Sequence, residues 1–386
     1  MMIPSISELT GYSIPTVTKF IQEGISEGIV TATEKTTSTG TRGRKGMMYS
    51  LNPETAYFLG VDTKHYGLII SLMDITGRIV AECEKKELGF MNTPQYMEKM
   101  CIAIKKFISE CGVPKRMIAR ACFNISGRVD TEKGVSHSIF AFEDNDDMPI
   151  AEILGDKIGI RSVIENDTRA MLCGEISRGG TKAYRDCLYV NASWGLGLGI
   201  LMDGKVYRGS NGFAGEFGHI NAFNNEIICH CGKKGCLETE VSGNATRRIF
   251  LEQIAEGKSS VLCHTSGDIQ KITPHDIIQA ANNEDTLCQD IIERMGRQLG
   301  RQLANLINIF NPEAVIIGGS MSKDNDLLLE SVKMGIKKYS LKLINRNLVV
   351  ERSSDPDRIG VTGACMVARE RFLMEYFASQ PQNINI

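Results

Sequence analysis

FLGVDTKHYGLIISLMDITGRIVA, residues 58–81, sets the pattern on which most of the chain is built. Its apolar runs at 59–61, 68–73 and 79–81 are separated by short turns, which predicts three successive strands. A similar plan recurs at 188–207, LYVNASWGLGLGILMDGKVY, about 130 residues further along. Two copies of one supersecondary unit predict a duplicated α/β domain with a cleft between its halves.

Helix and strand patterns alternate through the rest of the chain, which is the order of an α/β protein. Amphipathic stretches and apolar runs predict helices at 93–111, 150–158, 287–310 and 360–377, and strands at 117–123, 162–165 and 314–317. We place this domain at 54–386, with a boundary between its lobes near 173–187. We expect the last helix to return to the first lobe.

The first 53 residues follow a different pattern and predict a separate domain. Apolar residues recur at helical spacing between Ile6 and Ile25, interrupted by a turn at 10–13. Ser13 can cap the second helix, and Pro15 suits its first turn. The pattern therefore predicts a helix, a tight turn and a second helix.

A hairpin is predicted after these helices, with strands at 29–33 and 47–51 and a polar tip at 36–46. From Lys35 to Pro53 there is no acidic residue, and Lys35, Arg42, Arg44 and Lys45 supply four cations that could contact phosphates. A DNA-binding wing and a solvated loop on a small helical cap are both compatible with this pattern.

Composition indicates a soluble globular protein, since 42% of the 386 residues are hydrophobic and 23% are charged. The 44 Lys and Arg residues nearly balance the 46 Asp and Glu residues, so any DNA contact requires a local basic patch. Apolar runs are far shorter than the roughly 18 residues of a membrane span, and the N-terminus lacks a signal-peptide pattern. We expect a cytoplasmic protein with no membrane partner.

Cysteine spacing predicts a metal site. The 12 cysteines are too sparse for a disulfide framework, but Cys229, Cys231 and Cys236 lie within eight residues, and His219 precedes them. One imidazole and three thiolates are the ligands of a closed tetrahedral zinc site, in which the ion is structural. His230 is a competing ligand on the sequence alone, and a group of buried free cysteines is the alternative.

Three acidic residues are candidates for contact with ligand hydroxyl groups. Glu216 and Glu238 flank the cysteine cluster, so a rigid metal loop would hold both as acceptors. The alternative is that they are surface acids. Asp167 follows a predicted strand and opens a helix, where it can cap that helix or accept a proton from a hydroxyl.

Glycines at two places are candidates for nucleotide binding. Gly195, Gly197 and Gly199 alternate at the predicted hairpin turn of the second copy, where backbone amides could approach an anion. Gly318 and Gly319 follow a predicted strand. That position suits either a nucleotide or a turn that needs positive φ at the start of a helix.

Together these residues resemble the ROK family of repressors, open reading frames and sugar kinases, from about Ser5 to Ala368. The most specific part is GEFGH at 215–219 followed by CHCGKKGCLE at 229–238, which is similar to the family's zinc motif. The resemblance implies an actin-like fold of the hexokinase and RNase H-like type, in which two lobes close on a sugar.

The resemblance also implies roles for single residues. The zinc ligands would be His219, Cys229, Cys231 and Cys236, which leaves His230 as a bystander. Sugar hydroxyls would contact Asn166, Asp167, Glu216, His219 and Glu238. In the family's kinases the residue that matches Asp167 is the general base, and Mg²⁺ and ATP would be bound near Asp62, Gly195, Gly197, Gly199, Gly318 and Gly319.

One departure concerns the first phosphate loop, which in family kinases resembles Asp-Ile-Gly-Gly-Thr-Lys. Here Asp62-Thr63-Lys64 lacks the two glycines, so bulky side chains occupy the place of a phosphate and the loop is predicted to be disabled.

A second departure is the N-terminal domain, which resembles the winged helix-turn-helix of ROK repressors. Thr16, Thr18 and Lys19 would lie on its recognition helix, and RGRK at 42–45 resembles the wing and linker that contact DNA. Such a domain normally has a further helix before these two. We therefore expect the true start to lie upstream of Met1.

The leading hypothesis is a sugar-responsive transcriptional regulator of carbohydrate metabolism, a repressor that binds a palindromic operator as a homodimer or homotetramer. A sugar or sugar phosphate would bind between the lobes, and zinc would be structural. The alternative is an ATP-dependent sugar kinase that uses Asp167 and Mg²⁺. A third hypothesis is a sugar sensor that acts by binding another protein.

Overall fold

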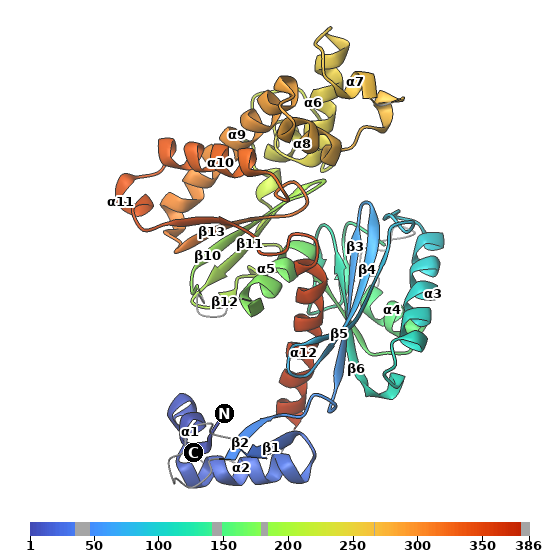
Figure 1. The fold of residues 1–386 in the computed structure, drawn as a ribbon, viewed down its shortest axis with the longest axis vertical. Coiled ribbons are helices and arrows are strands. Elements are labelled where there is room, and N and C mark those ends of the chain that lie inside the picture. Colours follow the sequence, from blue (N-terminus) through green and yellow to red (C-terminus); the bar gives the residue numbers. More distant parts are fainter. Residues whose placement is uncertain (35–46, 141–148, 179–183, 266, 380–386) are drawn as a thin grey trace.

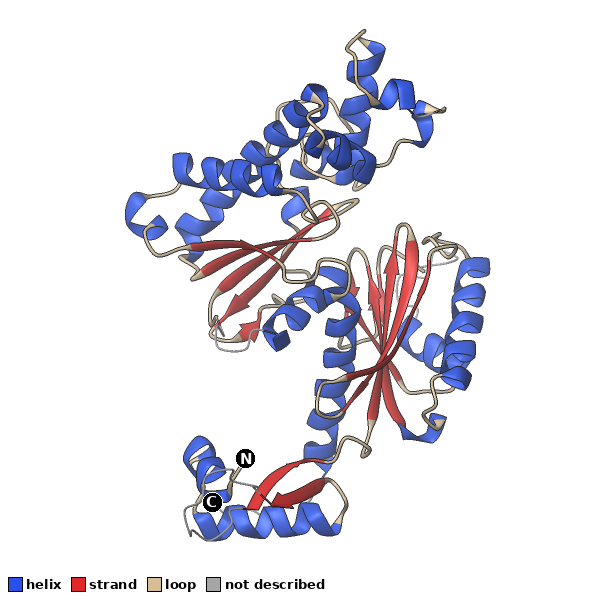
Figure 2. Ribbon diagram, viewed as in Figure 1, coloured by secondary structure: helices blue, strands red, loops and turns tan. Residues whose placement is uncertain are grey.

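The structure is a computed structural model that describes residues 1–34, 47–140, 149–178, 184–265 and 267–379. Two sheets, each flanked by helices, form two lobes, and a small unit of helices and one hairpin lies at the lower end of the view (Figures 1 and 2). Within these ranges, no helix combines the length and apolar character needed to cross a bilayer.

The N-terminal unit consists of α1 (Ile3–Thr10), α2 (Ile14–Ser26), β1 (Val30–Glu34) and β2 (Met47–Leu51). Gly11 ends α1 at φ 73°, and the Ser13 hydroxyl caps α2 by accepting a hydrogen bond from the Thr16 amide. The helices and the antiparallel hairpin lie where the sequence predicts them. The hairpin tip lies outside the described residues, together with Arg42, Arg44 and Lys45.

Lobe one is built on a five-stranded sheet in the order β5-β4-β3-β6-β9. Its strands are β3 (Tyr57–Lys64), β4 (Gly67–Asp74), β5 (Ile79–Lys85), β6 (Ile118–Ile125) and β9 (Ser162–Asn166). The first three strands form an antiparallel meander, and β6 and β9 add parallel to β3. The three strands predicted from 58–81 are therefore confirmed.

Helices cover both faces of this sheet because side chains alternate along each strand. Leu59 and Val61 of β3 pack beneath α3 (Pro94–Glu110) and α4 (Ile150–Ile158). Phe58 points to the opposite face and packs with α12 (Ile359–Ser379). The C-terminal helix thus covers the sheet of lobe one.

Lobe two repeats this topology in the order β12-β11-β10-β13-β14. Its strands are β10 (Cys187–Ala192), β11 (Leu196–Met202), β12 (Lys205–Val206), β13 (Ala314–Gly318) and β14 (Val349–Arg352). Numbered along the chain, the strands of both sheets follow the order 3-2-1-4-5. This shared order is the duplication that the two strand patterns predict.

The core of lobe two lies between its sheet and a layer of helices. That layer contains α6 (Gly243–Ala255), α8 (Pro274–Asn282), α9 (Thr286–Phe310) and α10 (Asp326–Tyr339). On the other face, Tyr189 of β10 packs with α5 (Asp167–Arg178). Shorter elements lie in the connections, namely η1 (Lys115–Met117), β7 (Val129–Asp130), β8 (Val135–Ser136), η2 (Phe217–His219), η3 (Leu237–Thr239), α7 (Leu262–Thr265), η4 (Ile269–Lys271) and α11 (Lys342–Asn345).

Helices α5 and α12 pack against each other between the lobes (Figure 1). Their backbones touch, since a Cβ atom at Gly363 would lie 1.7 Å from the carbonyl oxygen of Ala170. From this contact α12 runs along lobe one to the N-terminal unit, where the Tyr376 hydroxyl donates a 3.4 Å hydrogen bond to Glu27. One continuous helix therefore connects the region between the lobes with the N-terminal unit.

Candidate functional site

A cleft of about 800 Å³ lies between the lobes. It is lined by the β3–β4 turn and the segment after β6 from lobe one, and by the β10–β11 turn and the segment after β13 from lobe two. The predicted site residues that line it are Asp62, Asn166, Asp167, Gly195, Gly197, Glu216, His219 and Glu238. Gly199, Gly318 and Gly319 are not among its lining residues.

Asp167 is the first residue of α5, directly after the end of β9, and it lines the cleft. Its carboxylate accepts hydrogen bonds from the Ser126 hydroxyl and the Thr168 amide, both at 2.7 Å, and from the Asn166 side chain at 3.2 Å. Burial raises the pKa of Asp167, and the bonds from Ser126 and Thr168 offset part of that rise. The carboxylate is thus an oriented acceptor beside the cleft.

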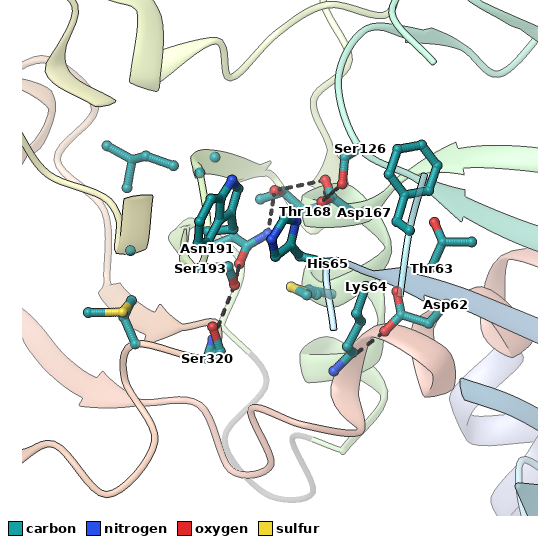
Figure 3. Close-up of a pocket in the computed structure, with 18 of the residues that line it drawn as sticks. Asp62, Thr63, Lys64, His65, Ser126, Asp167, Thr168, Asn191, Ser193 and Ser320 are labelled. Atoms are coloured by element: carbon teal, nitrogen blue, oxygen red, sulfur yellow. Dashed lines mark hydrogen bonds and ion pairs between the residues drawn. The ribbon is translucent and has the colours of Figure 1, made fainter. Parts of the chain in front are cut away.

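Hydrogen bonds continue from Asp167 across the base of the cleft into lobe two (Figure 3). The Thr168 hydroxyl donates to Asp167 and accepts a 3.1 Å bond from the side chain of Asn191. The Ser193 hydroxyl in turn donates to Asn191 at 2.6 Å and accepts from the Ser320 amide at 3.1 Å. The two lobes therefore share one polar network beneath the ligand space.

The predicted metal ligands His219, Cys229, Cys231 and Cys236 lie together, with their donor atoms within 4.8 Å of one another. His219 Nδ1 is 3.5 Å from Cys229 Sγ, and the sulfurs of Cys231 and Cys236 are 3.6 Å apart. In a tetrahedral zinc site, bonds of about 2.3 Å to sulfur and 2.0 Å to nitrogen separate the ligand atoms by about 3.5–3.8 Å. The donor set and its spacing therefore fit zinc.

His230 lies beside this cluster and contacts Glu238. Its Nδ1 is 2.9 Å from Glu238 Oε1, and its side chain is 70% exposed. The second oxygen of Glu238 accepts a 2.9 Å hydrogen bond from the Leu196 amide. His219, His230 and Glu238 form an alternative group of possible ligands, but this group has one imidazole at the surface and lacks the thiolates of the closed site.

Glu216, His219 and Glu238 line the cleft from the segment 215–238, called the metal loop because it carries the predicted metal ligands. In His219, Nδ1 faces Cys229 Sγ, and Nε2 lies 3.8 Å from a carboxylate oxygen of Glu216. The loop is packed tightly on β11, since a Cβ atom at Gly215 would lie 2.0 Å from the Leu198 carbonyl oxygen, and Gly215 has φ +95°. Two carboxylates and one imidazole are thus presented on a fixed backbone.

Aromatic rings connect the two turns that the family resemblance assigns to phosphates. His65 of the β3–β4 turn stacks on Trp194 of the β10–β11 turn, with ring centroids 4.0 Å apart and planes 9° from parallel. Tyr66 meets Trp194 edge-on at 5.9 Å. Burial lowers the pKa of His65, which favours the neutral ring near pH 7. Side chains, and not bare backbone, therefore occupy the space between these turns.

Asp62 is enclosed by its surroundings in lobe one and is only 1% exposed. One of its carboxylate oxygens accepts a 3.4 Å bond from Asn124, and the other lies 3.7 Å from Lys64 Nζ. The start of α12 covers it, since a Cβ atom at Gly360 would lie 2.5 Å from Oδ2. A metal–nucleotide complex would have to displace these contacts to reach Asp62.

The glycines of β11 differ from the prediction in their location. β10 ends at Ala192 and β11 begins at Leu196, so Gly197 and Gly199 lie within the strand and not in the turn. A Cβ atom at Gly197 would lie 2.2 Å from Thr168 Oγ1, and one at Gly199 would lie 3.1 Å from the Leu172 side chain. Both glycines therefore let α5 pack closely on β11.

The second glycine pair, Gly318 and Gly319, also has a packing role. A Cβ atom at Gly318 would lie 2.0 Å from the Tyr189 hydroxyl oxygen. Gly319 has φ +83°, and a Cβ atom there would lie 2.4 Å from the Ala192 carbonyl oxygen. The positive φ agrees with the tight turn predicted as one alternative for a glycine pair after a strand.

The predicted DNA-contacting residues of α2 differ in whether their polar groups already have hydrogen-bond partners within the chain. The Thr18 hydroxyl donates to a carbonyl one turn earlier at 2.8 Å, and the Thr16 hydroxyl lies 2.8 Å from that of Ser13. Lys19 has a side chain that is 74% exposed and lies 3.8 Å from Glu23. Lys19 therefore has an ammonium group that can reach an external anion.

The sequence did not mark several polar residues of the cleft, among them Ser126, Asn191, Ser193 and Ser320. Single serines and asparagines carry no spacing pattern that marks them. Their common signal is position, because each lies at or just after the carboxyl end of β6, β10 or β13. Ligands of open α/β sheets bind at such strand ends.

Two related lobes of the same strand order, with a polar cleft between them, define the class of actin-like α/β proteins. The family model described as "ROK family" matches residues 59–371, which is most of the chain. The protein belongs to the ROK family.

Regulators and a kinase of this family are similar to the chain. The DNA-binding transcriptional repressor Mlc of Escherichia coli (strain K12) is 26% identical over 94% of this chain and 87% of the repressor. A solved ROK family transcriptional regulator, a homologue of the E. coli MLC protein, has a TM-score of 0.80 and 25% identity over 97% of this chain and 94% of that chain.

A ROK family glucokinase from Streptomyces griseus, solved in complex with glucose and AMPPNP, has a TM-score of 0.70 and 25% identity. The match covers all of that chain but 82% of this one. The two regulators therefore match more of this chain than the glucokinase does.

Proposed function

We propose that this protein is a sugar-responsive transcriptional regulator, a cytoplasmic repressor of carbohydrate metabolism genes. The observation that carries the proposal is the joining of a helix–turn–helix and hairpin to a polar cleft that retains its acceptor residues. The part of the chain that the glucokinase does not match is comparable in size to this N-terminal unit. Similarity to regulators over nearly the whole chain supports the same function.

The effector is a sugar or sugar phosphate bound between the lobes. Asn166, Asp167, Glu216, His219 and Glu238 supply hydrogen-bonding groups for its hydroxyls, and all five line the cleft. Carboxylates that accept from hydroxyl groups make charge-assisted hydrogen bonds, which are stronger than neutral ones. The same residues could orient a sugar without any phosphoryl transfer.

Zinc is the metal that suits His219, Cys229, Cys231 and Cys236. Four protein ligands would make the ion structural, because they leave no position for a reacting water. Binding through Nδ1 of His219 leaves Nε2 available to a sugar hydroxyl or to Glu216. The metal would thereby fix the orientation of a sugar-contacting imidazole.

ATP-dependent sugar phosphorylation, with Asp167 as general base and Mg²⁺ as cofactor, is the alternative function. The raised pKa of Asp167 and its place beside the cleft are compatible with that role. The stack of His65 on Trp194 argues against it, because phosphates approaching either turn would meet side chains. We therefore propose that the protein is not an active kinase.

Sugar binding would be coupled to DNA binding through lobe closure. α12 begins at the cleft and contacts the N-terminal unit through Tyr376 and Glu27, so a change in lobe geometry can reach α2. A homodimer or homotetramer would place two recognition helices about one DNA turn apart on a palindromic operator. The size of the response is limited by the difference in sugar affinity between the two states.

Calorimetry tests the ligand assignment. We expect the zinc-loaded chain to bind one member of a panel of hexoses, N-acetylhexosamines and their 6-phosphates, and to give no signal with Mg²⁺-ATP. Asp167→Asn should weaken sugar binding by about 10- to 100-fold, since a hydrogen bond to a charged group contributes about 1.5–3 kcal/mol. Asp203→Asn, at a turn residue that is 84% exposed, is the matched control. Micromolar ATP binding with turnover would support the kinase alternative.

Anisotropy titration tests the DNA assignment, with an operator duplex selected from random sequence by the full chain. Lys19→Ala should weaken binding and reduce the slope of log affinity against log salt by about 1, as expected for the loss of one phosphate contact. Lys271→Ala is the control, because the Lys271 side chain is 85% exposed and, like Lys19, lies near an acidic residue a few positions away, Asp268. Equal affinities for the wild type and Lys19→Ala would remove α2 from the DNA interface.

A further inference from the structure

A buried ion cluster lies directly behind the cleft. Glu165, the residue before Asn166 and Asp167, has no exposed surface, and its two carboxylate oxygens face two arginines. Arg169 Nε donates to Oε1 at 2.7 Å, and Arg208 Nη2 donates to Oε2 at 2.8 Å. Burial acts to raise the pKa of Glu165, but the two guanidinium groups lower it below its ordinary value, which keeps the carboxylate charged.

Arg169 extends this cluster to two other segments of the chain. Its Nη1 donates to the Gly212 carbonyl at 2.5 Å, and its Nη2 donates to the Val129 carbonyl at 3.1 Å. Thr131 adds a 3.0 Å bond to the Glu165 carboxylate. A Cβ atom at Gly212 would lie 3.3 Å from the Val129 carbonyl oxygen, so these two segments are in contact as well. One guanidinium group thus joins three stretches of backbone.

Two of these three stretches carry residues of the proposed sugar site, and the third carries a residue that is hydrogen-bonded to one of them. The stretch around Val129 follows Ser126, which donates to Asp167. The start of α5 carries Asn166 and Asp167, and the stretch around Gly212 leads into Glu216 of the metal loop. The relative positions of these polar groups therefore depend on the bonds that Arg169 makes.

Stabilisation of the fold alone does not account for the ion cluster of Glu165, Arg169 and Arg208. Burying two charges costs desolvation energy that offsets much of their attraction, so a buried ion pair is weak evidence of stability. The cluster also leaves Arg208 Nε without a hydrogen-bond partner among the described residues. What the cluster does provide is geometry, because the planar guanidinium of Arg169 holds a carboxylate and two carbonyls at fixed angles.

We propose that Arg169 is a positioning residue for the sugar ligand, which sets the distance between the Asp167 side of the cleft and the loop that carries Glu216. This inference rests on the proposed function. Arg169 is 3% exposed and does not itself line the cleft, so it would act through the segments that it joins and not by touching the sugar.

Arg169→Lys tests this role, because lysine keeps the charge but cannot bond a carboxylate and two carbonyls in one plane. Sugar affinity measured by calorimetry on the full, zinc-loaded chain should fall by about 10- to 100-fold, the scale expected for a misplacement of about 1 Å. Zinc content should stay at the wild-type value. Arg169→Ala should regain part of the lost sugar affinity on addition of guanidinium chloride at non-denaturing concentration.

Arg120→Lys is the matched control. Arg120 is also 3% exposed and is paired with Glu375, but it lies away from the cleft. The Arg120→Lys substitution should lower the melting temperature without changing sugar affinity. If Arg169→Lys does not fold, Glu165→Gln keeps the side-chain volume and carries the same expectation.

Wild-type sugar affinity in a folded Arg169→Lys chain would overturn the inference, and so would an equal loss in Arg120→Lys. Absence of sugar binding by the wild-type chain would instead overturn the proposed function, and the inference with it.

Discussion

Replacing Cys231 by serine is expected to abolish zinc binding, lower the melting temperature by roughly 5 °C or more and weaken sugar binding at least tenfold. A serine hydroxyl does not replace a thiolate ligand, and the binding energy of a structural zinc is also folding energy. Each kcal/mol lost shifts the midpoint by about 2–4 °C in a domain of this size. Sugar affinity falls with the metal because His219 and Glu238 lose the loop that orients them.

Metal analysis and calorimetry on the purified variant measure these effects. Cys263→Ser is the control, since Cys263 is a free cysteine of α7 outside the cluster and should leave zinc content unchanged. If Cys231→Ser retained zinc and His230→Ala lost it, the ion would instead be bound by His219, His230 and Glu238.

Gly363→Ala is expected to lower the free energy of unfolding by about 3 kcal/mol, the upper range for overpacking. Gly363 of α12 faces Ala170 of α5. In turn, a Cβ atom at Gly174 of α5 would lie 2.3 Å from the carbonyl oxygen of Ile359 in α12. Neither backbone can yield without separating the helices. Asp167 begins α5, so the change should also reduce sugar affinity.

Thermal and chemical unfolding of Gly363→Ala beside Gly267→Ala measures this effect. A Cβ atom at Gly267 would meet no atom of the described residues within 4 Å, and its φ is not in the left-handed region, so this control should unfold like the wild type. Wild-type stability in Gly363→Ala would mean that α5 and α12 can separate without cost.

The sheets could be predicted because their signals are local. Each strand of 58–81 and 188–207 is an apolar run ended by a short turn, and the structure has strands at these places. The predicted duplication is also confirmed, since the strands of both sheets follow the same order. The packing role of Gly197 could not be predicted, because Thr168, which its close contact accommodates, belongs to another element.

The metal cluster could be predicted for the same reason, with three cysteines inside one short loop. The stack of His65 on Trp194 could not, although Trp194 is the only tryptophan in the chain, because its two rings come from turns about 130 residues apart. The roles of Glu165 and Arg169 were hidden likewise, since their partners at Val129 and Gly212 lie on separate segments.

Patterns confined to short stretches of the sequence thus predict the strands, the capped helices, the cluster of His219 with three cysteines and the family. They do so because hydrophobic periodicity, capping and ligand spacing act between residues close together in the chain. Three features depend on contacts between distant segments: the glycines that let α5 pack on β11, the rings that stack between the β3–β4 and β10–β11 turns, and the arginine that joins segments behind the cleft. Those contacts arise when the lobes pack, because packing brings Arg169 to Gly212 and His65 to Trp194.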